Sequence, residues 1–354
     1  MKKLLCALAG ICVVFSAGMV QAGPKWDFGD DSWMKLSFLG QVHASYNDEA
    51  NPETDVFLRR ARVILAGQIT DGVLFFAETD NDNAGKAGRG DVSTDIQDAI
   101  VDIRIMDSAH WVKAGLILLP FSFETRSSAG SLLGIDYNSE AIKLANTFVW
   151  RDYGAEAHGA FMDNKIAYTV GVFDGYDSEN GTKSEEAEAR VTGHVIVSLV
   201  GDAETGWFYG QDRRGAAGNY LEVGAGYDRQ GKATAVAGVG DAAPTVADSD
   251  AWVVDFKGGM ELGENLDLIV NGAWYDWDNA SFKGSTAFVE SGLSLGKTMV
   301  TGKYALQDPD GSDEIIDYTA GVHYFMKNHN VRGGLEYRWG DSAETVLAGL
   351  QFLL

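Results

Sequence analysis

Apolar and polar residues alternate along most of the chain after residue 32. Over residues 33–46 the even positions are mainly apolar, from Met34 to Tyr46, whereas the odd positions from 35 are mainly polar and include Lys35, Gln41 and His43. The same period of two recurs over residues 265–277, 315–327 and 330–339. Such alternation is typical of β-strands with one apolar face. We count about sixteen such segments, each near the ~9–11 residues that a tilted membrane strand needs.

The connections between these segments alternate in length. Short turns are predicted at residues 163–164, 263–264 and 296–297. Longer, acidic loops are predicted at residues 47–55, 81–94, 119–151, 174–185, 230–249 and 308–314. Short turns on one side and long loops on the other are typical of outer-membrane barrels. Residues 201–218 depart from this rule, because they form a long connection where a short turn is expected.

A soluble β-sandwich also alternates, but two further features favour a barrel. Aromatic residues lie near strand ends on the apolar phase, as the interfacial girdle of a membrane barrel requires; they are Tyr46, Trp252, Trp274, Tyr337 and Trp339. The chain also ends in ETVLAGLQFLL, an in-phase strand suited to pairing with the first strand. The sequence therefore predicts an all-β fold, an antiparallel transmembrane β-barrel of about 16 strands over residues 23–354.

The N-terminus has the order of features found in a secretory signal peptide. Lys2 and Lys3 precede an apolar run, and Val20-Gln21-Ala22 provides a small-residue cleavage site. A membrane anchor is disfavoured because the run is short, and a lipoprotein is disfavoured because Ile11 precedes Cys12. We predict that residues 1–22 are removed, which takes away both cysteines and leaves 332 residues. An exported chain of this kind is expected in the outer membrane of a Gram-negative-type bacterium.

Composition excludes several other classes. The formal net charge of −23 argues against nucleic-acid binding. The sequence lacks the HExxH and P-loop motifs, so we predict no enzyme and no cofactor. The six histidines are scattered, so no metal site is predicted. The segment from Asp80 to Asp91 matches only half of a calcium loop, and we interpret it as a solvated loop.

The stretch DVFLRRARVILAG, residues 55–67, places three arginines inside an apolar run. Arg60 and Arg62 share the phase of Gln68, which we assign to the lumen. Arg59 falls on the other phase, where a guanidinium facing lipid would cost ~2–4 kcal/mol. We therefore expect Arg59 near the rim, at a bulge or in a subunit interface. Two interpretations of these arginines are compatible with each other. In the first they line a pore as a basic patch, and in the second they pair with an acidic lumen wall formed by Glu78, Asp98 and Asp102.

Three segments resemble the phosphate-selective porins O and P. They are FLRRARVILAG (57–67), LPFSFETRSS (119–128) and EAIKLANTFVWRDYGAEAHG (140–159). The resemblance implies a homotrimer of sixteen-stranded barrels in outer-membrane lipid and lipopolysaccharide, with the long third loop folded into the lumen as a constriction that attracts anions. Carried over to this sequence, the constriction residues would be Arg59, Arg60, Arg62, Phe121, Ser122, Glu124, Arg151 and Asp152, with Lys113 and Arg104 nearby. Arg190 lies on the polar phase of its own segment and would extend the basic ladder.

These observations lead to one principal hypothesis and two alternatives. The principal hypothesis is an outer-membrane porin for passive diffusion of small hydrophilic solutes and ions, including anions such as phosphate, through an arginine-lined constriction. The first alternative is a general or cation-preferring porin of the same fold, because the acidic loops repel anions. The second is a non-conducting barrel that acts as a surface adhesin or as a divalent-binding structural protein.

Overall fold

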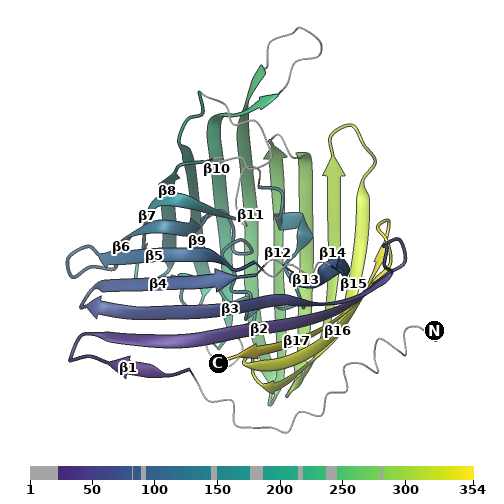
Figure 1. Cartoon of the computed structure of the whole chain (residues 1–354), viewed down its shortest axis with the longest axis horizontal. Coiled ribbons are helices and arrows are strands. Elements are labelled where there is room, and N and C mark those ends of the chain that lie inside the picture. Colours follow the sequence, from purple (N-terminus) through teal and green to yellow (C-terminus); the bar gives the residue numbers. More distant parts are fainter. Residues whose placement is uncertain are drawn as a thin grey trace.

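The computed structural model describes residues 23–81, 83–88, 93–144, 150–175, 186–213, 218–236, 245–279 and 282–354. The predicted signal peptide, residues 1–22, lies outside them. Within the described residues, 17 strands form one sheet (Figure 1). No helix in this part of the chain is long and apolar enough to cross a membrane.

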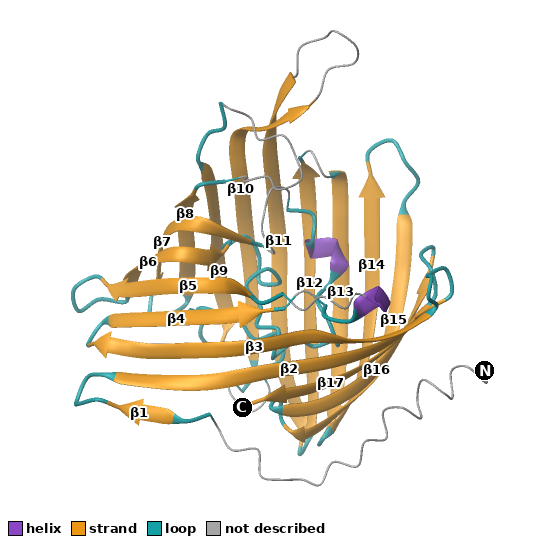
Figure 2. Cartoon of the chain, in the orientation of Figure 1, coloured by secondary structure: helices purple, strands orange, loops and turns teal. Residues whose placement is uncertain are grey.

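The strand bounds are β1 Lys25–Asp27, β2 Trp33–Asn47, β3 Thr54–Thr70, β4 Val73–Asp80, β5 Asp95–Arg104, β6 His110–Leu118, β7 Arg151–Phe161, β8 Ile166–Phe173, β9 Arg190–Val200, β10 Tyr220–Val236, β11 Thr245–Gly263, β12 Leu266–Asp278, β13 Lys283–Leu295, β14 Thr298–Pro309, β15 Ile315–Lys327, β16 Val331–Gly340 and β17 Thr345–Leu353. Two short 3₁₀ turns, η1 Lys86–Gly88 and η2 Ser139–Ala141, lie in loops (Figure 2).

Strands β2 to β17 close into an antiparallel barrel. Each pairs with the next in chain order, and β17 pairs back onto β2, where Gln351 lies opposite Gln41. The extra strand β1 pairs with the first residues of β2, which β17 does not reach. A closed barrel leaves no unpaired strand edge in the lipid. The predicted fold class, with about 16 strands, is confirmed.

The alternation of the sequence follows the two faces of this barrel. Outward positions such as Val170, Val254 and Val322 are apolar and exposed, as a lipid-facing wall requires. Inward positions are polar or charged and buried, because other parts of the chain fill the interior. Three predicted short turns and the bounds of β15 agree with the structure.

The predicted loop at residues 230–249 is wrong in its bounds. Strand β10 continues to Val236 and β11 begins at Thr245, with a register shift between Gln230 and Thr234. The two strands therefore extend beyond the rest of the barrel as a narrow arm (Figure 1). Such an arm has no lipid-facing side, so the sequence there lacks the period of two that marks the other strands.

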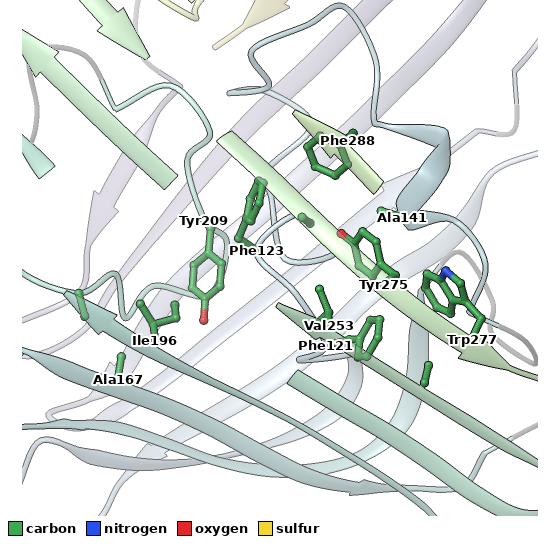
Figure 3. Packing of buried hydrophobic residues seen from close by; sticks show 13 residues of the cluster. Phe121, Phe123, Ala141, Ala167, Ile196, Tyr209, Val253, Tyr275, Trp277 and Phe288 are labelled. Carbon is green, nitrogen blue, oxygen red and sulfur yellow. The ribbon is translucent and has the colours of Figure 1, made fainter. Parts of the chain in front are cut away.

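The described residues of two connections lie inside the barrel and pack against its inner wall. The first is the third loop, residues 119–150 between β6 and β7. The second, named here the β9–β10 segment, is residues 201–219. Together with wall residues they form a buried apolar cluster, which includes Phe121 and Phe123 of the third loop, Tyr209 of the β9–β10 segment, and Tyr275 and Trp277 of β12 (Figure 3). A second cluster, around Phe76 and Phe173, fills the interior beside β4–β8.

Candidate functional site

The third loop is tied to the inner wall on several sides. The Phe123 N–H donates to the Asp255 carboxylate of β11 at 2.8 Å. The Arg332 guanidinium of β16 donates to the Leu132 carbonyl at 2.6 Å, and the Gln41 side chain of β2 donates to the Ala129 carbonyl at 2.9 Å. Because β11, β16 and β2 lie at different places around the barrel, the loop crosses the interior between them.

Arg59 and Arg60 hold the third loop through one carboxylate. Arg59 Nε lies 2.6 Å and Arg60 Nη2 lies 3.0 Å from the oxygens of Asp136. The register of β2 and β3 shifts so that Gln41 faces Arg60 and the next pair is Val42 with Leu58, which leaves Arg59 as the extra residue of a β-bulge. The bulge lets two consecutive arginines face inward. Burial disfavours the Asp136 anion, but Arg60 and Arg59 outweigh it and hold the pKa of Asp136 well below its usual range.

Arg62 and Arg151 continue these contacts along the wall. Arg62 lies 3.0 Å from Glu78 and 2.7 Å from Asp80. Arg151 lies 3.3 Å from Glu78 and 2.8 Å from Asp98. Of the three acidic-wall residues named from the sequence, Glu78 contacts Arg62 of the RRAR stretch, and both Glu78 and Asp98 contact Arg151. Each of these arginines has a carboxylate partner.

Lys113 and Asp102 belong to a neighbouring network. Lys113 Nζ lies 2.5 Å from Glu156, which also accepts from Arg126 of the third loop at 3.0 Å. Asp102 contacts His158 of β7 at 3.0 Å. Asp102 is therefore paired with a histidine rather than with an arginine of β3.

Three other predicted residues lie apart from the third loop. Arg190 Nε pairs with Asp228 at 2.7 Å, and Arg190 Nη1 lies 4.0 Å from Asp152. Asp152 accepts the Gly175 N–H at 3.0 Å. Arg104 is half-buried next to a short turn, 2.5 Å from Asp71. The structure does not bring Arg104 together with the other predicted residues.

The first residues of the third loop anchor it. The Phe121 ring packs against Tyr275 and Trp277, with ring centroids 5.9 and 5.5 Å away. Ser122 accepts the Tyr275 hydroxyl at 3.3 Å. Glu124, fully buried, accepts the Asn138 N–H at 2.8 Å and so closes the loop on itself. Burial and the nearby Glu290 raise the pKa of Glu124 well above its usual range.

The β9–β10 segment pairs with the third loop inside the barrel. The Tyr209 N–H donates to the Arg126 carbonyl at 2.7 Å, and the Ser128 N–H donates to the Tyr209 carbonyl at 2.9 Å. The buried Gln211 side chain accepts the Leu133 N–H at 2.8 Å and donates to Glu124. The two segments therefore support each other across the lumen.

The third loop leaves a cavity of about 220 Å³ against β13–β17. Residues 133–139 of the loop form one side of it. The wall opposite carries a row of inward residues that face one another across neighbouring strands, Glu290, Lys303, Thr319, Arg338 and Thr345. Glu336 and Asp136 also line this cavity, so its lining carries both signs of charge.

Comparison with known proteins agrees with this architecture. Residues 37–200 match the family model of the phosphate-selective porins O and P. The match covers the RRAR strand and the third loop and confirms the resemblance drawn from the motifs. No curated protein matches the sequence.

Solved structures show the same porin fold. A mutant of the porin of Rhodopseudomonas blastica is 16% identical, with a TM-score of 0.55, and the match covers 91% of this chain and all of that one. A loop-deletion mutant of OmpT of Vibrio cholerae is 12% identical, with a TM-score of 0.57, and the match covers 92% of this chain and all of that one. Fold and family match together support an outer-membrane porin.

The sequence analysis does not identify two cations and one element of the barrel interior. Lys303 and Arg338 line the cavity, although neither was named as a constriction residue. Both lie at the polar, inward-facing positions of their strands. This alternation is the sequence pattern that could have indicated that they face the lumen. The inward course of the β9–β10 segment was also missed, although its aromatic run Trp207-Phe208-Tyr209 on the short-turn side indicated burial.

Proposed function

We propose that the chain forms a passive diffusion pore for small hydrophilic solutes and ions. The observation that supports this best is the cavity between the third loop and β13–β17, whose lining includes charged and hydroxyl side chains, since apolar clusters fill much of the interior beside β4–β13. A cavity lined by charged and hydroxyl groups offers hydrated solutes the contacts that they lose from water. We take this cavity as the narrow part of the route.

The contacts of the arginines bear on ion selectivity. Arg59 and Arg60 share the carboxylate of Asp136, and Arg62 contacts both Glu78 and Asp80, so three carboxylates lie against these three guanidiniums. Exposed acidic residues surround the long-loop end of the cavity strands, in the connections β2–β3, β14–β15 and β16–β17; they are Asp48, Glu49, Glu53, Asp310, Asp313, Glu314, Asp341 and Glu344. Such a rim gathers cations and repels anions. We therefore propose a weak preference for cations.

The first test is reconstitution of the mature protein in a planar bilayer across a potassium chloride gradient. A reversal potential of the sign given by excess potassium flux is the expected result. An anion-selective potential would contradict the proposed preference and favour a second candidate, an anion or phosphate pore. The family match and the inward-facing Lys303 and Arg338 favour that candidate. Absence of conductance would contradict the pore itself and favour the adhesin or structural alternative.

The resemblance to the O and P porins also leads us to propose a homotrimer. Chemical crosslinking and mass measurement in detergent test this proposal. A single mass equal to three chains is expected, and a stable monomer would contradict it.

A further inference from the structure

A second cavity, of about 510 Å³, lies at the short-turn end of the barrel and is named here the short-turn pocket. Its described lining includes Ala109 and Asn164 of two short connections and Thr205 of the β9–β10 segment. These described lining residues are all different from those that line the cavity against β13–β17. Short turns of an outer-membrane barrel face the periplasm. The volume falls within the ~300–1,000 Å³ of pockets for small ligands.

Three tryptophans line the short-turn pocket. Trp33 of β2 and Trp111 of β6 lie at inward positions, where the strand register places them opposite Gln68 and His158, respectively. Trp207 belongs to the β9–β10 segment. All three side chains are half-buried, so each keeps part of its ring surface exposed. The interior of a water-filled barrel is polar, so exposed aromatic surface at this place indicates contact with a ligand.

A buried carboxylate connects this aromatic group. Asp102 of β5 is 1% exposed, lies 3.0 Å from His158 Nε2 and accepts the Trp207 indole N–H at 2.6 Å. The His158 ring is in turn nearly parallel to the Trp111 ring, at an interplanar angle of 15° with the centroids 6.4 Å apart. Two of the tryptophans are therefore linked through Asp102 and His158. Side chains that are oriented before a ligand arrives lose less conformational entropy when it binds.

The charged side chains around the short-turn pocket are paired. The Lys25 ammonium lies 5.2 Å from the centre of the Trp33 ring. The Arg104 guanidinium lies 5.8 Å from the centre of the Trp111 ring. These two cations, and the lysine that follows Asn164 in sequence, each contact an aspartate, in the pairs Lys25–Asp27, Arg104–Asp71 and Lys165–Asp202. A solute ion of either sign would meet like charges, which oppose binding, so the pocket favours a solute without charge.

A neutral sugar matches these features. A pyranose ring has a face of C–H groups, which stacks on an aromatic ring, and an edge of hydroxyl groups, which exchange hydrogen bonds with polar side chains. The tryptophans provide the aromatic surface, and the exposed Asn164 amide and Thr205 hydroxyl provide donors and acceptors. A wholly apolar solute would take these polar groups out of water without replacing their hydrogen bonds.

We propose that the short-turn pocket binds a neutral sugar, with a sugar ring on the exposed tryptophan surface and its hydroxyl groups bonded to Asn164 and Thr205. The same chemistry has two sources on this side of the membrane, a free sugar in the periplasm and a glycan of the cell wall. The site does not rest on the proposed pore function, because binding is measured without current.

The test is saturation-transfer NMR on the wild-type barrel in lauryldimethylamine oxide, a detergent without a sugar headgroup. Glucose and maltose represent free sugars, and chitotriose, a trimer of N-acetylglucosamine, represents a cell-wall glycan. Sorbitol, an open-chain polyol similar in size to glucose, is the matched control because it has hydroxyl groups but no ring. We expect saturation transfer to the C–H protons of a ring sugar and little transfer to sorbitol. The sugar that binds more tightly identifies the source.

Four variants locate the binding. Trp111→Ala should weaken sugar binding about 3- to 10-fold, the effect of losing one aromatic contact. Trp33→Ala, at another strand of the pocket, should do the same, and it keeps the test intact if Trp111→Ala fails to fold. Trp207→Phe keeps an aromatic ring and should retain most of the binding. Trp252→Ala removes an exposed tryptophan that does not line the pocket, and it should leave binding unchanged.

Two results would overturn the sugar site. One is equal saturation transfer to the ring sugars and to sorbitol. The other is wild-type affinity in both Trp111→Ala and Trp33→Ala. Both results leave the pore function intact, because conductance in a planar bilayer tests that function separately.

Discussion

Single arginines of this barrel differ according to whether a carboxylate lies next to them. Arg62 has two carboxylate neighbours, Glu78 and Asp80, whereas Arg338 has none among the described residues. Replacing one partner of a buried ion pair leaves the other charge buried without compensation. The stability lost in this way is larger than the net stability that the intact pair contributes. The same substitution should therefore lower the stability of the barrel more at Arg62 than at Arg338.

Arg62→Gln should lower the free energy of unfolding by about 3 kcal/mol, because the buried Glu78 would keep only its weaker contact with Arg151 and the half-buried Asp80 would lose its cation. Urea unfolding of the folded barrel in detergent micelles measures the change. Arg229→Gln, in an exposed position, should alter stability little. The double variant Arg62→Gln with Glu78→Gln should regain part of the loss. An equal loss in Arg62→Gln and Arg229→Gln would show that the Arg62 contacts do not stabilise the barrel.

The residues of the lumen could be predicted from the sequence only as far as strand phase allows. The alternation of inward and outward positions predicts that Arg60 and Arg62 face the lumen. For Arg59, a β-bulge is one of the predicted explanations. Which carboxylate each arginine meets depends on contacts between distant segments, as with Asp136 of the third loop. For the same reason Lys303 and Arg338 were not recognised, because strand register brings them to one level of the wall.

At the scale of elements, the third loop and the β9–β10 segment depend on each other through Gln211. Gln211→Ala would leave the Leu133 N–H and one Glu124 oxygen without their partner, at a cost of about 1–3 kcal/mol for each buried group. We expect faster hydrogen exchange over residues 124–133 and a noisier open-channel current.

Thr205→Ala is the matched control, since Thr205 lies in the same segment and is exposed. It should change neither hydrogen exchange nor current noise. If Gln211→Ala also left both unchanged, the third loop would hold its position without the β9–β10 segment.

The strands were the most predictable elements, because lipid on one side and lumen on the other impose a period of two on each of them. The alternation of apolar and polar residues is absent where a segment does not face lipid on one side and the lumen on the other. The arm of β10 and β11 beyond residue 230 lies above the barrel. Its sequence predicts a loop, although the structure has two strands there. The β9–β10 segment has no regular period, so its unusual length was visible in the sequence but its inward course was not.

At the scale of the whole molecule, buried and exposed charges should respond differently to salt. The Debye length falls from about 10 Å at 0.1 M to about 3 Å at 1 M, so exposed charges are screened while buried pairs are screened much less. The proposed cation preference is attributed to the exposed acidic rim. The reversal potential at a fixed concentration ratio should therefore move toward zero as the mean salt concentration rises from 0.1 to 1 M.

The same salt series separates the rim from the cavity. Stability measured by urea unfolding should change little across it, because the Arg62 and Arg151 contacts are buried. Neutralising rim residues, as in Asp310→Asn with Asp313→Asn, should reduce the low-salt preference. A cation preference that persisted at 1 M and survived these substitutions would place selectivity at Glu290 and Glu336 inside the cavity.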